Sequence, residues 1–281
     1  MAANHEPEQP NPRRAQGLLV TLLMIPVGVL VFVASKSITR EFGALGGLLA
    51  GGIAGGLFYF ISRGLRRAKQ MRAPSAADVL ATDDRPPVLY LRPFSNDGVV
   101  LSGHYFLFKT YEEHLVKALS DIGPVVAVGS PGENARTPEV GAARMYLRDD
   151  AWQERVGHLI RQSSLIVLHG GSSPGVLWEL RSVLAQGRPE RLIVCLPVDA
   201  AQTPKKLRHA EARYVDFVRS SWGIFPRPLP LFAGGCAFLY FLPDWTPQLL
   251  RRDMPVPAGY PPQTAALRGL GSSFRSRLAT A

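Results

Sequence analysis

The chain has 281 residues, enough for a pair of membrane helices and one full-sized domain, but too few for two large globular domains. Its formal net charge is +10 at pH 7, and the five basic residues between positions 63 and 72 supply half of it. Because this cluster directly follows an apolar segment, we expect it to face anionic lipid headgroups, and we predict no binding to nucleic acid. The two cysteines, Cys195 and Cys236, lie in apolar runs, which is typical of reduced core residues.

Two segments without charged side chains, residues 17–35 and 44–62, each approach the roughly 20 residues that a helix needs to cross a bilayer. We predict a transmembrane hairpin over residues 17–62, and a cleaved signal peptide is the alternative for its first half. Basic residues are more numerous on the outer flanks of the pair than in the loop between its two segments. The positive-inside rule then predicts a multi-pass protein of the inner (plasma) membrane, with residues 1–16 and the following domain in the cytoplasm.

Glycines recur at every fourth position of the second apolar segment, from Gly43 through Gly47 and Gly51 to Gly55. A face of small residues lets two helices approach closely within a bilayer. The glycine face packs either against the first segment of the same chain or against a second copy, and its spacing leaves both open. A homo-oligomer therefore joins the membrane among the expected partners.

Short apolar runs alternate with amphipathic stretches after a basic juxtamembrane linker, residues 63–84. The apolar runs predict strands at residues 88–91, 125–128, 165–168, 192–196 and 237–241. Helical spacing of apolar residues predicts helices that begin near Tyr111, Trp152 and Pro174, and a fourth over 206–220. Ser173 and Pro174 suit the N-cap and first position of the third helix.

This alternation predicts an α/β fold: a flavodoxin-like, doubly wound, five-stranded parallel sheet of order 2-1-3-4-5 over residues 85–253, preceded by two transmembrane helices. The connection over residues 129–148 is long for a plain loop, and we predict a lid or association loop there. Residues 254–281 are rich in proline, serine and arginine, which predicts a disordered tail.

In this topology a ligand binds where strands one and three end, because the crossovers leave the sheet on opposite faces at that point. Polar and glycine residues follow both strands there. The candidate nucleotide-binding residues are Arg92, Phe94 and Asp97 after strand one, and Gly170, Gly171, Ser172, Ser173 and Trp178 after strand three. Backbone N–H groups at a helix N-terminus bind phosphate, although a plain tight turn with an N-cap explains the same serines and glycines.

Glu179 is the candidate catalytic residue, because it lies within the third helix, beside Trp178 and above the predicted switch point. A carboxylate in such a place has a raised pKa or acts as a nucleophile, and it can stabilise the positive charge that develops when an N-glycosidic bond breaks. The alternative is a solvated helix residue paired with Arg181 or Arg188. The histidines show no spacing typical of metal ligands, so no metal is predicted.

The order of elements over residues 88–250 resembles the Toll/interleukin-1 receptor (TIR) domain, with the segment WQERVGHLIRQSSLIVLHGGSSPGVLWEL carrying the resemblance. The resemblance implies that Glu179 is the glutamate that cleaves NAD in enzymatic members of that family. The shorter segment SSPGVLWEL is similar to the signature of nucleoside 2-deoxyribosyltransferases. That family has Asp near Ser173, Thr at Val176 and Gly at Arg181, and these departures argue against its activity here.

The resemblance implies a membrane-anchored cytoplasmic TIR-like domain that binds NAD or a related nucleotide as substrate, and possesses an N-glycosidase activity used in signalling or defence. No cofactor is expected apart from that nucleotide. The alternative is a non-catalytic membrane scaffold that self-associates through the TIR-like domain and the glycine-rich helix.

Overall fold

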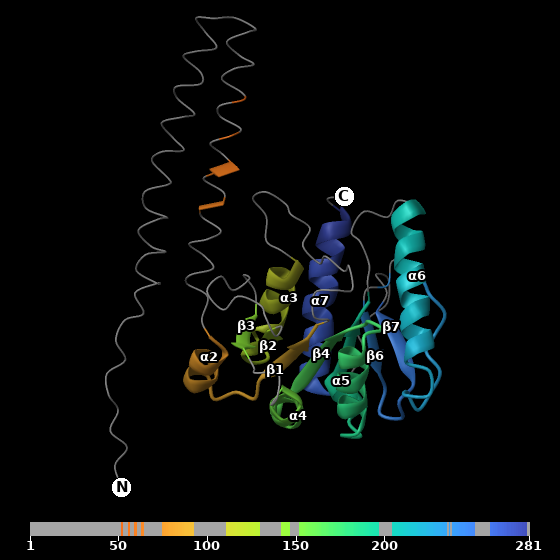
Figure 1. Ribbon diagram of the computed structural model, residues 1–281, viewed down its shortest axis with the longest axis horizontal. Helices are drawn as coiled ribbons and strands as arrows, with labels where there is room; N and C mark the ends of the chain where they lie inside the picture. The colour runs from red at the N-terminus through yellow and green to blue at the C-terminus, as the bar shows by residue number, and fades with distance from the viewer. Residues whose placement is uncertain are drawn as a thin grey trace, which may run out of the picture. The chain divides into compact units, whose positions relative to one another are not determined.

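The computed structural model describes residues 75–92, 111–129, 142–146, 152–196, 204–234, 236, 238–250 and 259–279, with six single positions between 52 and 64. Contacts divide the chain into two units, and every strand belongs to the unit made of residues 74–103, 110–133 and 141–281. Figure 1 shows this unit as a sheet with helices on both faces. The account below concerns this unit.

One seven-stranded sheet of order β3-β2-β1-β4-β5-β6-β7 forms the centre of the unit. Its strands are β1 (Val88–Leu91), β2 (Val125–Gly129), β3 (Ala143–Tyr146), β4 (Leu165–His169), β5 (Leu192–Cys195), β6 (Phe238–Phe241) and β7 (Pro247–Leu250). The pairs from β3 to β5 are parallel, whereas β6 pairs antiparallel with both β5 and β7. The central strand is β4, and β1 is one of its two hydrogen-bonded neighbours.

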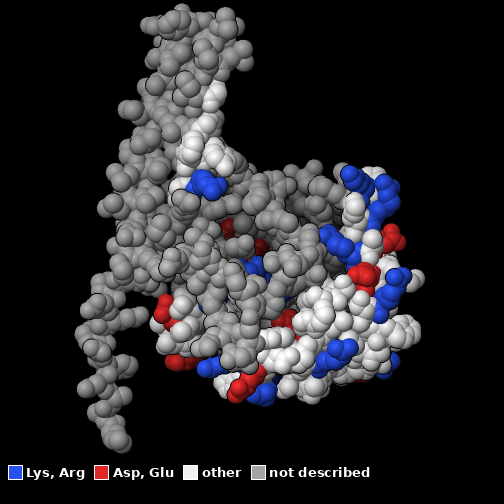
Figure 2. Space-filling model, in the orientation of Figure 1, with Lys and Arg blue, Asp and Glu red and all other residues white. Residues whose placement is uncertain are grey.

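Seven helices of the described residues surround or flank this sheet. They are α2 (Ala76–Thr82), α3 (Tyr111–Leu119), α4 (Trp152–Gln162), α5 (Pro174–Leu184), the 3-10 turn η1 (Pro189–Arg191), α6 (Pro204–Ser220) and α7 (Pro261–Ala279). The exposed residues of α6 include Lys205, Arg208, Glu211 and Asp216. Figure 2 shows basic and acidic side chains mixed on the described surface of the unit. Such a mixture of charges is typical of a solvated helix face.

Alternation along the strands divides the core between the two faces of the sheet. We call one the α3 face: it carries Val88 and Val167 and packs against buried residues of α3 and α7. The other is the α5 face, which carries Leu89 and Leu168 and packs against α4, α5 and α6. Because both faces are covered, the central strands are buried along their whole length and need a nearly continuous run of apolar residues.

The predicted fold class is wrong in two respects. The sheet has seven strands rather than five, and its β6 and β7 are antiparallel to their neighbours rather than parallel. β3 lies within the segment that we predicted as a lid or association loop, residues 129–148. The tail predicted to be disordered, residues 254–281, contains α7, whose Leu267 and Leu270 are buried in the core on the α3 face.

The predicted membrane anchor is also corrected. Among the helices that the structure describes, none is both long and apolar enough to cross a bilayer. The two predicted spans, 17–35 and 44–62, fall outside the described residues except for four positions of the second. The location in the inner membrane, which depended on those spans, is withdrawn with them.

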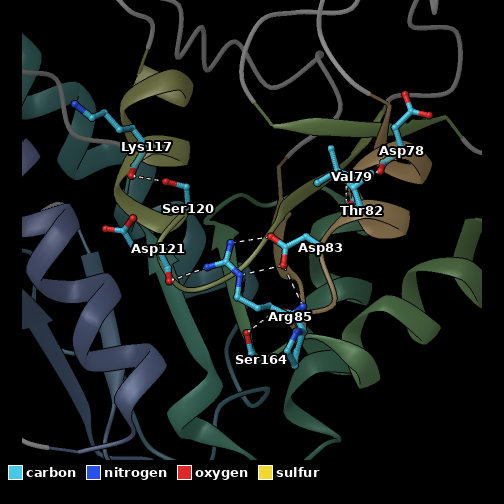
Figure 3. A network of polar contacts seen from close by, with 10 residues as sticks. Asp78, Val79, Thr82, Asp83, Arg85, Lys117, Ser120, Asp121 and Ser164 are labelled. Atoms are coloured by element: carbon cyan, nitrogen blue, oxygen red, sulfur yellow. Dashed lines mark hydrogen bonds and ion pairs between the residues drawn. The ribbon is translucent and has the colours of Figure 1, made fainter. Parts of the chain in front are cut away.

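A polar network closes the amino-terminal edge of the sheet (Figure 3). Arg85 donates to both carboxylate oxygens of Asp83, at 3.0 and 2.7 Å, and to the backbone carbonyl of Asp121 at 3.0 Å. This side-chain hydrogen bond holds the pKa of Asp83 below its usual value. Nearby, the backbone N–H of Ser164 donates to the carbonyl of Pro87 at 2.9 Å. The segments that enter β1, β2 and β4 are thus tied together.

Gly123 tests how tightly this edge is packed. A Cβ atom at Gly123 would collide with the carbonyl oxygen of Pro86, a backbone atom that cannot rotate away. We expect Gly123→Ala to lower the free energy of unfolding by about 1–3 kcal/mol. The control is Gly157→Ala in α4, where the new methyl group meets only the end of Arg161 at 3.6 Å and helix propensity improves by up to about 1 kcal/mol. Urea denaturation measures both, and equal stabilities would contradict the packing argument.

Candidate functional site at the carboxyl edge

The switch point of the sheet lies between β1 and β4. β1 is followed by α3, which covers one face, and β4 is followed by α5, which covers the other. The two strands are hydrogen-bonded neighbours from Val88 and Leu165 to Leu91 and Leu168. In open α/β sheets, ligands bind beyond the carboxyl ends of such a pair of strands.

The turn from β4 into α5 contains four of the candidate residues. The backbone N–H of Gly170 donates to the carbonyl of Cys195 at 2.9 Å, so this residue still follows the edge of the sheet. Ser173 is the N-cap of α5, and its hydroxyl oxygen accepts from the backbone N–H of Val176 at 3.5 Å. Gly171 and Ser172 are half-buried between them. The helix start predicted at Ser173 and Pro174 is confirmed.

Glu179 lies in the buried stripe of α5, together with Val176, Leu180 and Val183. Only 2% of its surface is exposed, and its Oε2 atom has no hydrogen-bond partner among the described residues. Burial raises the pKa of the Glu179 carboxyl to about 8. The group is therefore mostly protonated at neutral pH, and it is not the solvated, arginine-paired residue of the alternative interpretation.

Trp178 precedes Glu179 and packs against α4. Its ring meets the ring of Trp152 edge to face, with centroids 4.7 Å apart and planes at 69°. Both rings are half-buried and join α4 to α5. This contact fixes the rotation of α5 about its axis, which keeps Glu179 directed into the core.

The candidates that follow β1 are described only in part. Arg92 directly follows the strand and is half-buried. It acts electrostatically on Tyr90, whose side chain belongs to the α3 face, so Arg92 is near that face rather than near Glu179. Phe94 and Asp97 lie outside the described residues, and the predicted meeting of residues 92–97 with 170–179 stays a prediction.

The structure adds a buried ion pair that the sequence analysis missed. Nη2 of Arg144, on β3, donates to both carboxylate oxygens of Glu112, on α3, at 3.2 Å. Glu112 also accepts from the backbone N–H of Ala142 at 3.1 Å. Arg144 is 3% exposed and Glu112 is 8% exposed. The only signal in the sequence is an arginine within a short apolar run, and its partner lies 32 residues away.

Two further polar side chains, those of Tyr90 and His169, are fully buried. The hydroxyl of Tyr90 has no hydrogen-bond partner in the part of the chain that the structure describes. Burial, and to a smaller extent the positive charge of Arg213, lower the pKa of His169 to about 4, against the opposing effect of a hydrogen bond with the backbone of Gly170. Burial also raises the pKa of Tyr90 well above its usual value. Both groups are therefore neutral hydrogen-bond donors near pH 7.

Within the described residues, no three His, Cys, Asp or Glu side chains are grouped so that they could hold a metal ion. A scan against protein-family models gave no match, and searches of curated proteins and of solved structures gave no significant match.

Proposed function

We propose that this unit is a TIR-like domain that binds NAD or a related nucleotide beyond the carboxyl ends of β1 and β4 and cleaves its N-glycosidic bond. The observation that carries the proposal is Glu179: a buried carboxyl with a strongly raised pKa, on α5, the helix that follows β4. An unsatisfied buried carboxyl lowers the stability of a fold. Ionisable groups with strongly shifted pKa values are concentrated at active sites, where they bind ligands or take part in the reaction.

The turn before α5 supports the anionic part of such a ligand. Ser172 and Ser173 offer hydroxyl groups, and α5 is an 11-residue helix whose N-terminus carries a partial positive charge. A pyrophosphate oxygen bound there lies at the start of the same helix that carries Glu179. In this proposal α5 sets the distance between the pyrophosphate, which binds at its N-terminus, and the N-glycosidic bond, which lies near Glu179.

The chemistry requires the ionised form of Glu179. The nicotinamide ring of NAD is positively charged, so its approach favours the carboxylate and lowers the pKa from its ligand-free value. The C1′–N bond then breaks and its electron pair returns to the nicotinamide nitrogen, while the carboxylate stabilises the oxocarbenium-like sugar. Water adds its oxygen to C1′, and Glu179 accepts the proton that this water loses before releasing it to solvent.

The test is nicotinamide release by the full chain at high protein concentration. We expect Glu179→Gln, which keeps the shape and removes the charge, to lower kcat/KM by at least about a hundredfold. Glu154→Gln is the matched control, because Glu154 is an exposed residue in the first turn of α4. It should retain wild-type activity.

Two results would contradict the proposal. If the wild type and Glu179→Gln release nicotinamide at the same rate, another group performs the reaction. If the wild type neither binds NAD nor releases nicotinamide, the non-catalytic, self-associating scaffold becomes the better interpretation, and sedimentation would then decide whether the chain associates with itself.

A further inference from the structure

Two apolar side chains are exposed on one side of α6. Val215 is 45% exposed and Trp222, just after the helix, is 81% exposed, whereas Tyr214 and Phe217 are buried on the α5 face. Figure 1 shows α6 at the edge of the unit. The charged residues of this helix are well placed in water, but the tryptophan is not, because its ring gains stability when about 150–250 Å² of its surface is covered. Exposed aromatic residues are typical of contact surfaces.

The helical path continues beyond the last residue of α6. The backbone N–H of Ser221 donates to the carbonyl of Phe217 at 2.9 Å, and that of Trp222 donates to the carbonyl of Arg219 at 3.3 Å. Two helical turns contain about seven residues, so Trp222 lies almost directly along the helix axis from Val215. The two exposed apolar side chains therefore belong to one stripe.

The exposed residues around Val215 form a symmetric pattern. Arg208 and Trp222 lie equally far before and after Val215, and so do Glu211 and Arg219. At 3.6 residues per turn, the first two lie within about 20° of Val215 around the helix axis, and the second two lie about 40° to either side of it. All four side chains are exposed. Each position before Val215 thus has a counterpart of complementary chemistry after it.

Two copies of α6 that pack antiparallel, with Val215 at the two-fold axis, would bring these counterparts together. In a two-fold interface each residue faces the residue that lies equally far on the other side of the axis. Arg208 would lie opposite the partner's Trp222, where a guanidinium and an indole ring attract one another. Glu211 would lie opposite the partner's Arg219, which forms an ion pair. Each contact occurs twice in the dimer.

Charge favours this register over neighbouring ones. An axis between positions 213 and 214 would place Arg208 opposite the partner's Arg219. The same axis would place Glu211 opposite the partner's Asp216, so both pairs would repel. An axis at Ala212 would place Lys205 opposite the partner's Arg219, which also repel. The stripe is therefore complementary to a second copy of itself in the register centred on Val215.

We propose that α6 is the contact surface between two copies of this chain, packed antiparallel with Val215 at the two-fold axis. One helix from each copy makes a small interface, and interfaces below about 1,200 Å² are typical of weak, transient association. The dimer therefore forms at high protein concentration and dissociates on dilution. This contact goes beyond the proposed catalytic function and does not depend on it, because Glu179 is buried on α5.

The first experiment is sedimentation of the full chain over a wide range of protein concentration. We expect the wild type to change reversibly from monomer to dimer as the concentration rises. Trp222→Ala should weaken association at least tenfold, because a tryptophan at an interface commonly contributes a large share of the binding energy. The urea midpoint of this variant should match the wild type, since the side chain is 81% exposed.

The second experiment exchanges charges across the axis. Glu211→Arg and Arg219→Glu each place like charges opposite one another, so each variant alone should associate at least tenfold more weakly than the wild type. An equimolar mixture of the two should associate again, because each changed residue then faces a residue of opposite charge on the partner. The matched control is Asp216→Arg, which makes the same change of charge at an exposed position about 100° from Val215 around the helix axis. It should associate as the wild type does.

Three results would overturn the inference: a wild type that stays monomeric at every concentration, association of Trp222→Ala equal to that of the wild type, or equal losses in Glu211→Arg and Asp216→Arg. A mixture of the two charge variants that remains as weakly associated as each alone would also overturn it. This mixture decides the question even if Trp222→Ala proves less stable than the wild type. The release of nicotinamide is measured separately, so failure of that assay leaves the contact between copies unaffected.

Discussion

Raising the pH from 5 to 8 should lower the stability of the wild type through Glu179, and Glu179→Gln should abolish this part of the pH dependence. The carboxyl has a pKa near its ordinary 4.5 when unfolded and about 8 when folded. Between these values the folded state holds a proton that the unfolded state has lost, so the free energy of unfolding falls as pH rises. The slope is about 1.4 kcal/mol per pH unit, and the full effect is about 5 kcal/mol.

The measurement is urea denaturation of both proteins at half-unit steps from pH 4 to 9. Relative to the wild type, we expect Glu179→Gln to gain about 3 to 4 kcal/mol between pH 5 and pH 8. We compare how the free energy of unfolding of each protein changes with pH, rather than its value at one pH. The buried amide of the variant lowers stability by an amount that does not depend on pH. Glu154→Gln, on the exposed side of α4, should follow the wild type.

His169 should change the free energy of unfolding in the opposite direction, and at lower pH. Its pKa is about 4 in the folded state and 6.5 ordinarily, so the unfolded state binds the extra proton between these values. Stability from this group therefore rises with pH up to about 6.5. The two slopes offset one another between pH 4.5 and 6.5 in the wild type. In Glu179→Gln only the effect of His169 should remain, so the free energy of unfolding should rise with pH between pH 4.5 and 6.5. A free energy of unfolding that stays constant over this range would contradict the assigned burial of His169.

Removing α7 should prevent the unit from folding cooperatively. Its Ala266, Leu267 and Leu270 are buried against α3 and the sheet. The hydroxyl of Tyr260 donates to the carbonyl of Ser164 at 3.1 Å, and the side-chain amide of Gln263 lies 3.4 Å from the carbonyl of Phe241. A chain that stops before residue 259 leaves this apolar surface in water, and we expect it to lack a sharp unfolding transition.

A point substitution makes the same test quantitative. Leu267→Ala should lower the free energy of unfolding by about 2–5 kcal/mol, the usual cost of a cavity in place of a fully buried leucine. Arg268→Ala alters the next residue, which is exposed, and should change stability by no more than about 0.5 kcal/mol. Equal urea midpoints for the two variants, or a normal transition in the truncated chain, would show that α7 does not belong to this core.

The central strands could be predicted because burial on both faces leaves a direct trace in the sequence. β1 (VLYL) and β4 (LIVLH) are almost entirely apolar, and their length excludes a helix of ordinary size. The start of α5 was also predictable, since Ser173 and Pro174 act through contacts within one turn. Local chemistry of this kind needs no knowledge of distant residues.

The edge strands and the last helix depend on distant partners. β3 contains Arg144, whose buried charge is paired with Glu112, 32 residues away, and no local pattern reveals that pairing. β7 is half-buried and contains a proline and a glutamine, so it lacks the apolar run of a central strand. α7 has glycine at 269, where a Cβ atom would come within 2.6 Å of the carbonyl oxygen of Ala118. That glycine serves close packing against α3, although by composition it indicates a flexible tail.

The candidate site was predictable to a similar degree. Glu179 occupies the stripe of Val176, Leu180 and Val183, so helical spacing alone indicates its burial, whereas the size of its pKa shift depends on the packed core around it. The sequence analysis did not identify Tyr90 and His169 as buried polar groups of interest. Each ends an apolar run or stands within it, and a pattern search counts them as ordinary strand residues.

The contact between α3 and α7 joins residues almost 150 positions apart, and it has a consequence during synthesis. α7 is the last of the described elements to be synthesised, so the strands that emerge first, from β1 to β5, exist for a time with the α3 face only partly covered. Apolar residues such as Val88, Val167 and Ile193 then lack the cover that Leu267 and Leu270 later supply. A growing chain in this state is prone to association and is a natural client for chaperones until α7 has emerged and docked.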